Sequence, residues 1–316
     1  MKHFALHLMA MLCSIVASAQ ASLVATLTHG NEVTSFYSSN ALKEAYAVAA
    51  DGDVITLSPG TFTATYFKTK KVTVRGAGMM LNSNPTIISG ITRIDIPQTD
   101  DNKDFQMVFE GLYFPESILY YNIIDFSFTK CYIAQGFQSA GTSKLDNGRF
   151  IHCILDDAFV AKGSHTYVSC VVRGGSYGSG TQSFFNCDII NCTNYGKSYN
   201  NCLFVIPGKS ILGSGTTEMN CYYVGPSDNF FSNMPYAPNV TLPADTPVFK
   251  DGPDNYELLD ENAATWLGAD GTQVGIYGGS LPFDPATSNP KITKFNVAPK
   301  TTADGKLSVD IEIQAL

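Results

Sequence analysis

The sequence has few charged residues and little arginine. Charged residues make up 15% of its 316 residues, and arginine occurs only at Arg75, Arg93, Arg149 and Arg173. The formal net charge is −8. Proteins that bind nucleic acid neutralise its phosphates with clustered Lys and Arg, so we expect no nucleic-acid partner.

Long apolar runs are also missing after the first 21 residues. No later segment approaches about 18 consecutive apolar residues, so we expect no membrane-spanning helix. The first residues combine a positive Lys2, an apolar stretch over residues 4–16 and small residues at 17–19. This order is typical of a cleaved signal peptide. We expect residues 1–21 to be removed and the mature chain to be secreted, or exported to the periplasm or the outer cell surface.

Glycine, asparagine, serine, threonine and aromatic residues are abundant instead, which favours a chain of strands and turns. Seven cysteines follow residue 21, and this odd number argues against a complete disulfide framework. Six of them share a local pattern: an aromatic or apolar residue, two further residues, Cys, one residue and an apolar residue. The copies are FTKCYI, FIHCIL, YVSCVV, FFNCDI, YNNCLF and the looser EMNCYY.

The same pattern continues upstream with other small or apolar residues at the cysteine position. The full series is Ala77, Ile91, Leu112, Cys131, Cys153, Cys170, Cys187, Cys202 and Cys221. Its separations run from 14 to 22 residues, shorter and less regular than those of helical repeats or propellers. A short repeat of variable length predicts a coil of strands joined by loops, a β-helix.

Glycine and asparagine precede most residues of this series. The preceding column is Gly76, Gly90, Gly111, Lys130, His152, Ser169, Asn186, Asn201 and Asn220. These two residue types tolerate left-handed backbone best, so we expect a tight bend at this column in each coil. The cysteines then point inward and stack as a column of buried thiols.

The stacked cysteines have two alternative uses. A linear stack does not converge on a point, which disfavours a zinc site. A disulfide between neighbouring coils stays open, because coils lie about 4.8 Å apart and disulfides join Cα atoms about 4.4–6.8 Å apart. Buried reduced thiols are the interpretation that we favour. Cys192 lies outside the series, and we expect it to be a free thiol or a loop residue.

Both ends of the predicted coil carry signals for caps. Residues 22–38 alternate like strands and begin the coil, and a short helix follows that would cover its open end. The apolar face of this helix comprises Ala41, Leu42, Ala45 and Ala49. The tail alternates as two strands around a turn at residues 303–306.

Residues 52–62 read GDVITLSPGTF and residues 72–78 read VTVRGAG. With the helix before them, these stretches resemble the opening coils of the right-handed parallel β-helix superfamily of pectate-lyase-like proteins. Residues 247–279 are similar to the closing coil of such proteins. Repeat and resemblance together predict an all-β chain. Residues 22–285 form a single right-handed parallel β-helix solenoid with an N-terminal helical cap, and residues 286–316 form a C-terminal β-hairpin tail.

Candidate chemistry falls on residues 155–180. Asp156 follows Cys153 by three positions and Arg173 follows Cys170 by three, so stacking places Arg173 one coil above Asp156. An Asp156–Arg173 ion pair beside a solvated turn is the structural interpretation of this spacing.

The same run, LDDAFVAKGSH followed by GGSYG, resembles polygalacturonase-type glycoside hydrolases. That resemblance implies Asp156 and Asp157 as the acid and base of sugar hydrolysis, and Lys162 as the lysine of the hydrolase motif. Tyr177 stands where the motif has a histidine, which puts the activity in doubt.

A polysaccharide lyase would instead bind its substrate through Ca²⁺ and remove a proton with Arg or Lys. The acidic stretch that would hold Ca²⁺ in a lyase contains Asp95, Asp100, Asp101 and Asp104. Outside that case we expect no metal and no cofactor.

Tyrosines on the outer surface offer a way to bind sugar rings without catalysis. The candidates are Tyr120, Tyr121, Tyr132, Tyr177, Tyr195 and Tyr222, with Tyr177 and Tyr195 as the chosen binding residues. We therefore expect a non-catalytic secreted or surface protein that binds a polysaccharide or surface glycan, or serves as an adhesive element. The alternative is a polysaccharide lyase or glycoside hydrolase acting on a uronate-containing polysaccharide through Asp156, Asp157, Lys162 and Arg173. The oligomeric state stays open.

Overall fold

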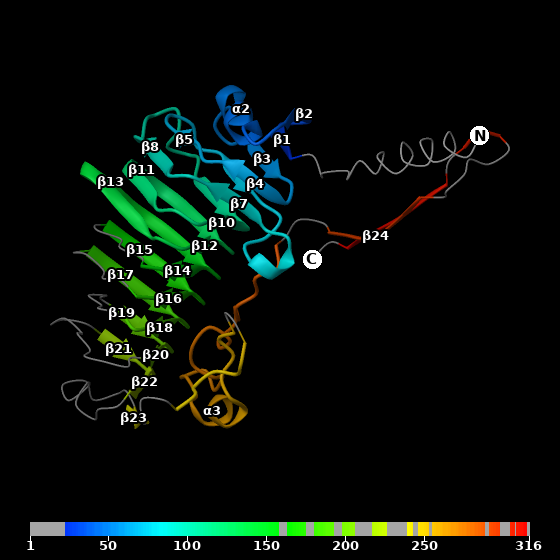
Figure 1. Ribbon diagram of the computed structural model, residues 1–316. Helices are drawn as coiled ribbons and strands as arrows, with labels where there is room; N and C mark the ends of the chain where they lie inside the picture. Colours follow the sequence, from blue (N-terminus) through cyan, green and yellow to red (C-terminus); the bar gives the residue numbers. More distant parts are fainter. Residues whose placement is uncertain are drawn as a thin grey trace, which may run out of the picture.

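The computed structural model describes residues 23–157, 163–174, 180–192, 198–205, 217–225, 239–242, 246–252, 255–287, 291–297, 304–306 and 308–314. Their strands stack into a parallel β-solenoid of about seven turns (Figure 1). Strands dominate and helices are few, which confirms the predicted all-β class. The stack is consistent with the predicted right-handed parallel β-helix.

Two long sheets run along the solenoid. Sheet A contains β1 (Val24–His29), β2 (Glu32–Tyr37), β3 (Val54–Leu57), β5 (Tyr66–Phe67), β6 (Thr73–Arg75), β8 (Thr92–Ile96), β9 (Met107–Glu110), β11 (Ile118–Thr129), β13 (Phe137–Ile151), β15 (Gly163–Val168), β17 (Gly180–Phe185), β19 (Ser198–Asn200) and β21 (Thr217–Met219). Sheet B contains β4 (Gly60–Thr63), β7 (Thr86–Ser89), β10 (Leu112–Phe114), β12 (Tyr132–Ile133), β14 (Ile154–Asp156), β16 (Val171–Arg173), β18 (Asp188–Ile190), β20 (Leu203–Val205), β22 (Tyr222–Gly225) and β23 (Asn239–Thr241).

The bend from sheet A to sheet B repeats with left-handed backbone, as predicted. Its φ values lie between 48° and 64° at Gly111, Lys130, His152, Ser169, Asn186, Asn201 and Asn220. Gly76 occupies the same column without a left-handed φ. A Cβ at Gly76 would lie 2.3 Å from the carbonyl oxygen of Gly111, so the close approach of two coils requires glycine there.

The cysteine column is confirmed as an interior stack. Its side chains are 0% exposed at Cys131, Cys153, Cys170, Cys187, Cys202 and Cys221. All of these thiols are free, and so is Cys192. Cys192 is also buried, and its Sγ lies 3.0 Å from the carbonyl oxygen of Gly174. The cysteines therefore act as small residues that fill the corner after each bend.

An aromatic column runs beside the thiols, three positions before Leu112 and before the cysteines from Cys131 to Cys202. The rings stack with centroids 4.4–5.6 Å apart and interplanar angles of 15° or less. The members are Phe109, Phe128, Phe150, Tyr167, Phe184 and Tyr199. The six-residue pattern of the sequence thus encodes two parallel stacks in one core.

The prediction for Ile91 is wrong, because its side chain is 50% exposed. Thr86 takes the inward place instead and pairs in register with Leu112. The hydroxyl of Thr86 donates to the carbonyl oxygen of Ser58 at 2.9 Å and accepts from the amide of Ala77 at 2.8 Å. This coil contains two successive strands, and Gly90 forms the bend from β7 in sheet B to β8 in sheet A rather than the bend from sheet A to sheet B.

In the N-terminal cap, the helix lies where the sequence predicts it, but the first two strands are arranged differently from the prediction. Helix α2 (Ala41–Val48) buries the predicted apolar face against the first coil. Strands β1 and β2 form an antiparallel hairpin, and β1 also pairs antiparallel with β3. The first two strands therefore extend sheet A beyond the solenoid and do not begin its coil.

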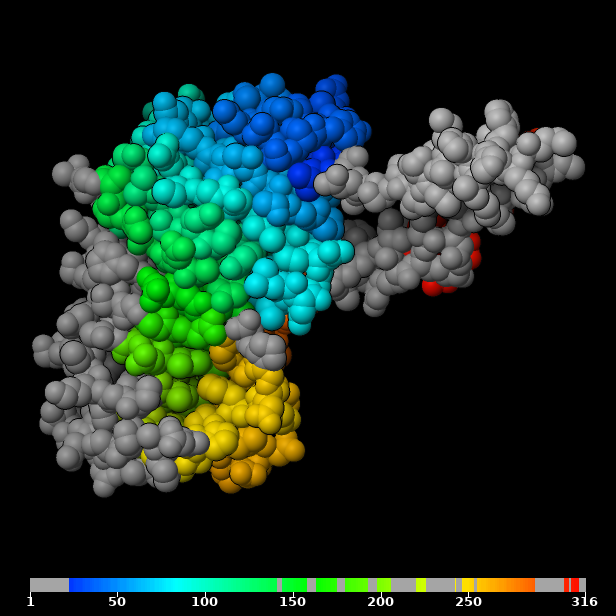
Figure 2. Space-filling model, in the orientation of Figure 1, coloured from blue at the N-terminus to red at the C-terminus, as the bar shows by residue number. Residues whose placement is uncertain are grey.

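The segment after the last coil, residues 246–287, does not close the stack as another turn. We call it the return segment, because it runs back along the outside of the solenoid toward the first coils (Figure 1). It contains helix α3 (Asp260–Thr265) and two isolated β-bridges. In Figure 2 its yellow and orange residues pack against the green coils.

Contacts along the bend column fix the path of the return segment. Its residues meet successively earlier coils: Ala269 donates to Asn201, Ser169 donates to Leu281, Lys130 pairs with Asp284 and Thr287 donates to Ala77. Two apolar clusters lie between it and sheet B, one around Tyr132, Ile154, Val171 and Phe283, the other around Leu203, Val224 and Trp266.

The predicted C-terminal hairpin is present. Strands β24 (Lys291–Val297) and β25 (Val309–Gln314) pair antiparallel, and β24 lies away from the stacked coils in Figure 1. A 3-10 helix, η1 (Leu81–Ser83), is also present among the described residues. Within the described residues, no helix is long and apolar enough to cross a membrane.

Candidate functional site

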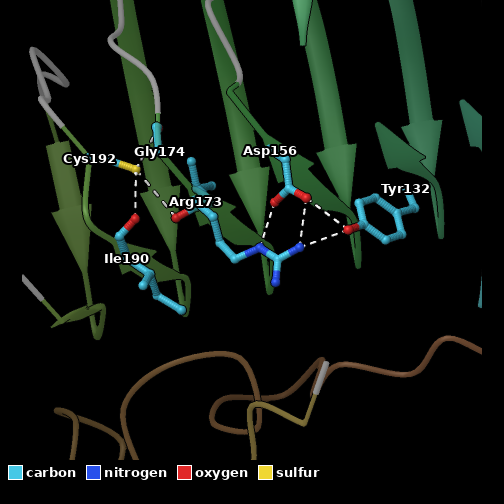
Figure 3. Close-up of polar contacts among 7 residues, drawn as sticks. Tyr132, Asp156, Arg173, Gly174, Ile190 and Cys192 are labelled. Atoms are coloured by element: carbon cyan, nitrogen blue, oxygen red, sulfur yellow. Dashed lines mark hydrogen bonds and ion pairs between the residues drawn. The ribbon is translucent and has the colours of Figure 1, made fainter. Parts of the chain in front are cut away.

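Asp156 and Arg173 occupy adjacent strands of sheet B and form the predicted ion pair. The two residues are paired in register between β14 and β16. Arg173 Nε donates to Oδ1 of Asp156 at 2.5 Å, and Nη2 donates to Oδ2 at 2.6 Å (Figure 3). This bidentate geometry is the strongest form of a guanidinium–carboxylate contact.

Tyr132 completes this network from the preceding coil. Its hydroxyl donates to Asp156 Oδ2 at 2.8 Å and lies 2.7 Å from Nη2 of Arg173 (Figure 3). The guanidinium also lies 5.9 Å from the ring centroid of Tyr132 and 5.6 Å from that of Tyr256 in the return segment. The hydrogen bonds from Asp156 are the main cause of the raised pKa of Arg173. Both oxygens of the carboxylate are therefore occupied beneath the return segment.

Asp157 lies on a different side of the coil from Asp156. It forms the left-handed bend that follows β14, with φ 44°, and its amide donates to the carbonyl oxygen of Arg173 at 2.9 Å. Its side chain is exposed and lines a shallow hollow of about 680 Å³. Among the described residues, Gln135, Phe137, Gln138 and Ser139 also line the hollow. This described part of the lining offers one carboxylate, two amides and a hydroxyl.

The remaining predicted site residues fall outside the described residues. These are Lys162, Tyr177 and Tyr195. Their proposed roles stay predictions.

The outward tyrosines of the sequence divide into three groups. Tyr120 is 1% exposed and belongs to the core, so its predicted outward position is wrong. Tyr132 and Tyr222 point out of sheet B but are covered by the return segment, where Tyr222 stacks on Trp266 at 6.0 Å. Tyr121 is half-buried on the free surface of sheet A. Strand β11 has a register shift after Tyr120. This shift interrupts the alternation of inward and outward side chains along the strand.

Tyr121 forms an aromatic pair with Tyr66, which the sequence did not single out. Their ring centroids are 6.3 Å apart with a 34° tilt, and Tyr66 is 37% exposed. The rings come from β5 and β11, which flank β8. We call this surface the tyrosine face.

Polar side chains surround the tyrosine face. Asp95 on β8 accepts hydrogen bonds from the hydroxyl of Tyr66 at 3.4 Å and from Nδ2 of Asn122 at 3.1 Å. The Lys68 ammonium lies 5.1 Å from the centroid of the Tyr66 ring, and Arg93 is exposed beside Asp95 on the same strand. Partial burial and the charge of Asp95 raise the pKa of Tyr66, so the phenol is neutral and donates its proton.

The acidic stretch predicted to hold Ca²⁺ in a lyase is dispersed. Asp95 belongs to the tyrosine face, whereas Asp100 pairs with Lys103 at 3.5 Å. Across the described ranges, no group of three or more His, Cys, Asp and Glu side chains converges as a metal site would require.

Comparisons with models of protein families, with curated proteins and with solved structures find no match for this chain. A fold can host many functions, so the site geometry is the main guide to the function of this chain.

Proposed function

We propose that this chain is an exported, non-catalytic β-solenoid that binds a glycan on its tyrosine face. The observation that carries the proposal is the exposed Tyr66–Tyr121 pair with Asp95 and Asn122 beside it. Export rests on the signal-like residues 1–21 of the sequence.

The chemistry of the tyrosine face matches that of a sugar ring. A pyranose presents an apolar C–H face, which packs on an aromatic ring, and a rim of hydroxyls, which need donors and acceptors. Tyrosine supplies a rigid apolar surface with a polar tip. Asp95, Asn122 and Arg93 supply an acceptor, an amide and a donor within the same three strands. An elongated flat sheet also suits a polymer better than a closed pocket does.

The geometry around Asp156 supports binding over hydrolysis. Glycoside hydrolysis needs two carboxyl groups that flank one bond, one of them free to carry a proton. Asp156 is bound by Arg173 and Tyr132, whereas Asp157 belongs to the exposed bend and the hollow. Because Arg173 and Tyr132 engage both oxygens of Asp156, neither oxygen is free to contact a glycosidic bond.

Glycan binding is tested with a panel of immobilised polysaccharides and the purified mature chain. We expect saturable binding to at least one polysaccharide, and a loss of at least tenfold in affinity for Tyr66→Ala with Tyr121→Ala. Phe185→Ala is a matched control, because Phe185 is an aromatic residue with the same 37% exposure on β17, remote from the tyrosine face. Equal losses in the control and the tyrosine variant would remove the tyrosine face as the binding site.

The alternative function is a polysaccharide lyase or glycoside hydrolase of the pectate-lyase-like superfamily. The hollow beside Asp157 is the observation that favours it, since its size suits a short oligosaccharide. The same panel is assayed for turnover with Ca²⁺ and with a chelator. Unsaturated products or new reducing ends that disappear in Asp157→Asn would establish this alternative and overturn the non-catalytic proposal.

A further inference from the structure

Strand β2 is an open edge of sheet A at the N-terminal end of the solenoid. It is the outermost strand in the sheet order and lies at the outside of the cap in Figure 1. Its six residues pair with β1 without a register shift. The sequence EVTSFY contains no proline and no lysine, the residues that usually protect an edge strand from further pairing.

The pairing with β1 fixes which backbone groups of β2 face outward. The amide of Ser38 donates to the carbonyl oxygen of Leu23, so these two residues form a hydrogen-bonded pair. Antiparallel ladders alternate between hydrogen-bonded and non-hydrogen-bonded pairs. The N–H and C=O groups of Val33, Ser35 and Tyr37 therefore point away from β1, toward the open edge.

The geometry points to a two-fold dimer in which β2 pairs antiparallel with β2 of a second copy of this chain. A two-fold dimer can pair the three outward residues with one another in a single register. In that register Ser35 lies on the two-fold axis. Ser35 then faces the partner's Ser35, and Val33 faces the partner's Tyr37. Each of the three pairs contributes two backbone hydrogen bonds, about six in total.

The side chains of β2 are self-complementary in this register. Val33 is 64% exposed and Tyr37 is 66% exposed, so both side chains are free to contact a partner strand. The dimer would place each valine beside a tyrosine on the same side of the joined sheet, and aromatic and β-branched residues are favourable cross-strand neighbours. Glu32, the single charged residue of the strand, would face the partner's Ser38 rather than another carboxylate.

These features favour a second copy over an unrelated peptide. A copy of β2 related by a two-fold axis matches β2 in both its backbone hydrogen bonds and its side-chain contacts. Two-fold symmetry is the usual geometry of homodimers. The chain carries a net charge of −8, so two copies repel each other overall. An edge with one charge in six residues is a place where that repulsion is small.

Sedimentation velocity of the full chain over a range of concentrations tests this dimer. We expect the sedimenting mass to double as the concentration rises. The double variant Val33→Lys with Tyr37→Lys should raise the dissociation constant of the dimer by about tenfold or more. At each of the two contacts between positions 33 and 37, a lysine then faces a lysine of the partner. Val33→Lys with Tyr37→Glu places opposite charges at the same two contacts and should restore the dimer. Ser35→Pro removes an outward N–H alone and should give a monomer.

Controls separate this interface from a folding defect. Leu281→Lys adds a lysine at another exposed apolar residue and should leave the dimer unchanged. Circular dichroism and glycan binding should be the same in all variants. A wild-type chain that stays monomeric, a dimer indifferent to the double-lysine change, or a lysine–glutamate variant no better than the double lysine would each overturn the proposed pairing.

Discussion

Asp188 is a buried acid that holds the return segment against sheet B. It is 1% exposed and accepts a hydrogen bond from the amide of Ile276 at 3.3 Å. Desolvation raises the pKa of Asp188 well above its ordinary value, and the Ile276 amide offsets only part of this effect. Between the ordinary and the raised pKa, the folded chain binds a proton that the unfolded chain releases. Its contribution to stability is therefore present in acid and lost as the pH rises.

Asp188→Asn should stabilise the protein at neutral pH. The amide keeps an oxygen for Ile276 and has no charge to desolvate. We expect a gain on the order of 1 kcal/mol at pH 7, or about 2–4 °C in Tm, measured by thermal unfolding. The gain should vanish near pH 3, where Asp188 is protonated in both states.

Asp284→Asn is the control, because this variant at another contact between the return segment and the coils should change stability in the opposite direction. Partial burial opposes ionisation of Asp284, but the amide of Ala286 and the Lys130 ammonium lower its pKa overall. Its contribution is present at neutral pH and lost in acid, so this variant should be slightly destabilised at pH 7. If both variants change stability in the same direction at pH 7, the opposite titration of the two aspartates is refuted.

Individual contacts were predictable where the coil repeats without interruption. The Asp156–Arg173 pair followed from equal offsets to two cysteines, because in-register stacking converts equal offsets into neighbours. Tyr66 was not found, since β5 has only two residues and carries no alternation to read. Tyr120 was misplaced because a register shift follows it in β11.

The thiol column is the element that best links sequence to structure. Parallel coils lie about 4.8 Å apart, whereas the Cβ atoms of a disulfide lie about 3.5–4.5 Å apart. Adjacent cysteines in register therefore meet a geometric obstacle to pairing, although their Cα separation alone permits it. The column is built to remain reduced.

Thiol counting checks this conclusion. All seven thiols are buried and out of reach of a reagent in solution, and burial raises the pKa of Cys131 and of Cys192 to about 12. We expect almost no reaction with an aromatic disulfide reagent in the folded chain. After denaturation without reductant, all seven thiols downstream of residue 21 should react. Five or fewer would mean that neighbouring coils had formed a disulfide. A sample reduced before denaturation is the control for the full count.

The bend column and the thiol column were visible because one short pattern recurs in each coil. The pattern is misleading where a coil holds an additional strand, as at Gly90 and Ile91, because the local residues there resemble the regular bend. The return segment gave no periodic signal at all. It is held by single contacts to successive bends, such as Asn201 to Ala269 and Lys130 to Asp284, and these depend on the folded coil.

At the scale of the whole molecule, the return segment connects coils that otherwise contact only their neighbours. In a solenoid each coil is stabilised by the coils on either side. Contacts of the return segment reach from the coil of Tyr222, where Trp266 stacks on the tyrosine, to the coil of Ala77, where Thr287 donates a hydrogen bond. We infer that it makes the unfolding of distant coils more cooperative. On β25 of the C-terminal hairpin, Val309 and Ile311 remain 46% and 48% exposed, so we expect the hairpin to contribute less to this cooperativity.

Two truncations distinguish these roles. A chain that ends after residue 287 loses the hairpin alone, and we expect its Tm to stay within about 2 °C of the full chain. A chain that ends after residue 245 also loses the return segment and uncovers Ile154, Val171 and Leu203, which are 0% exposed in the full chain. Uncovering these side chains should lower stability by several kcal/mol, broaden the thermal transition and increase binding of a hydrophobic dye. Equal transitions for the two truncations would show that the coils are stable without the return segment.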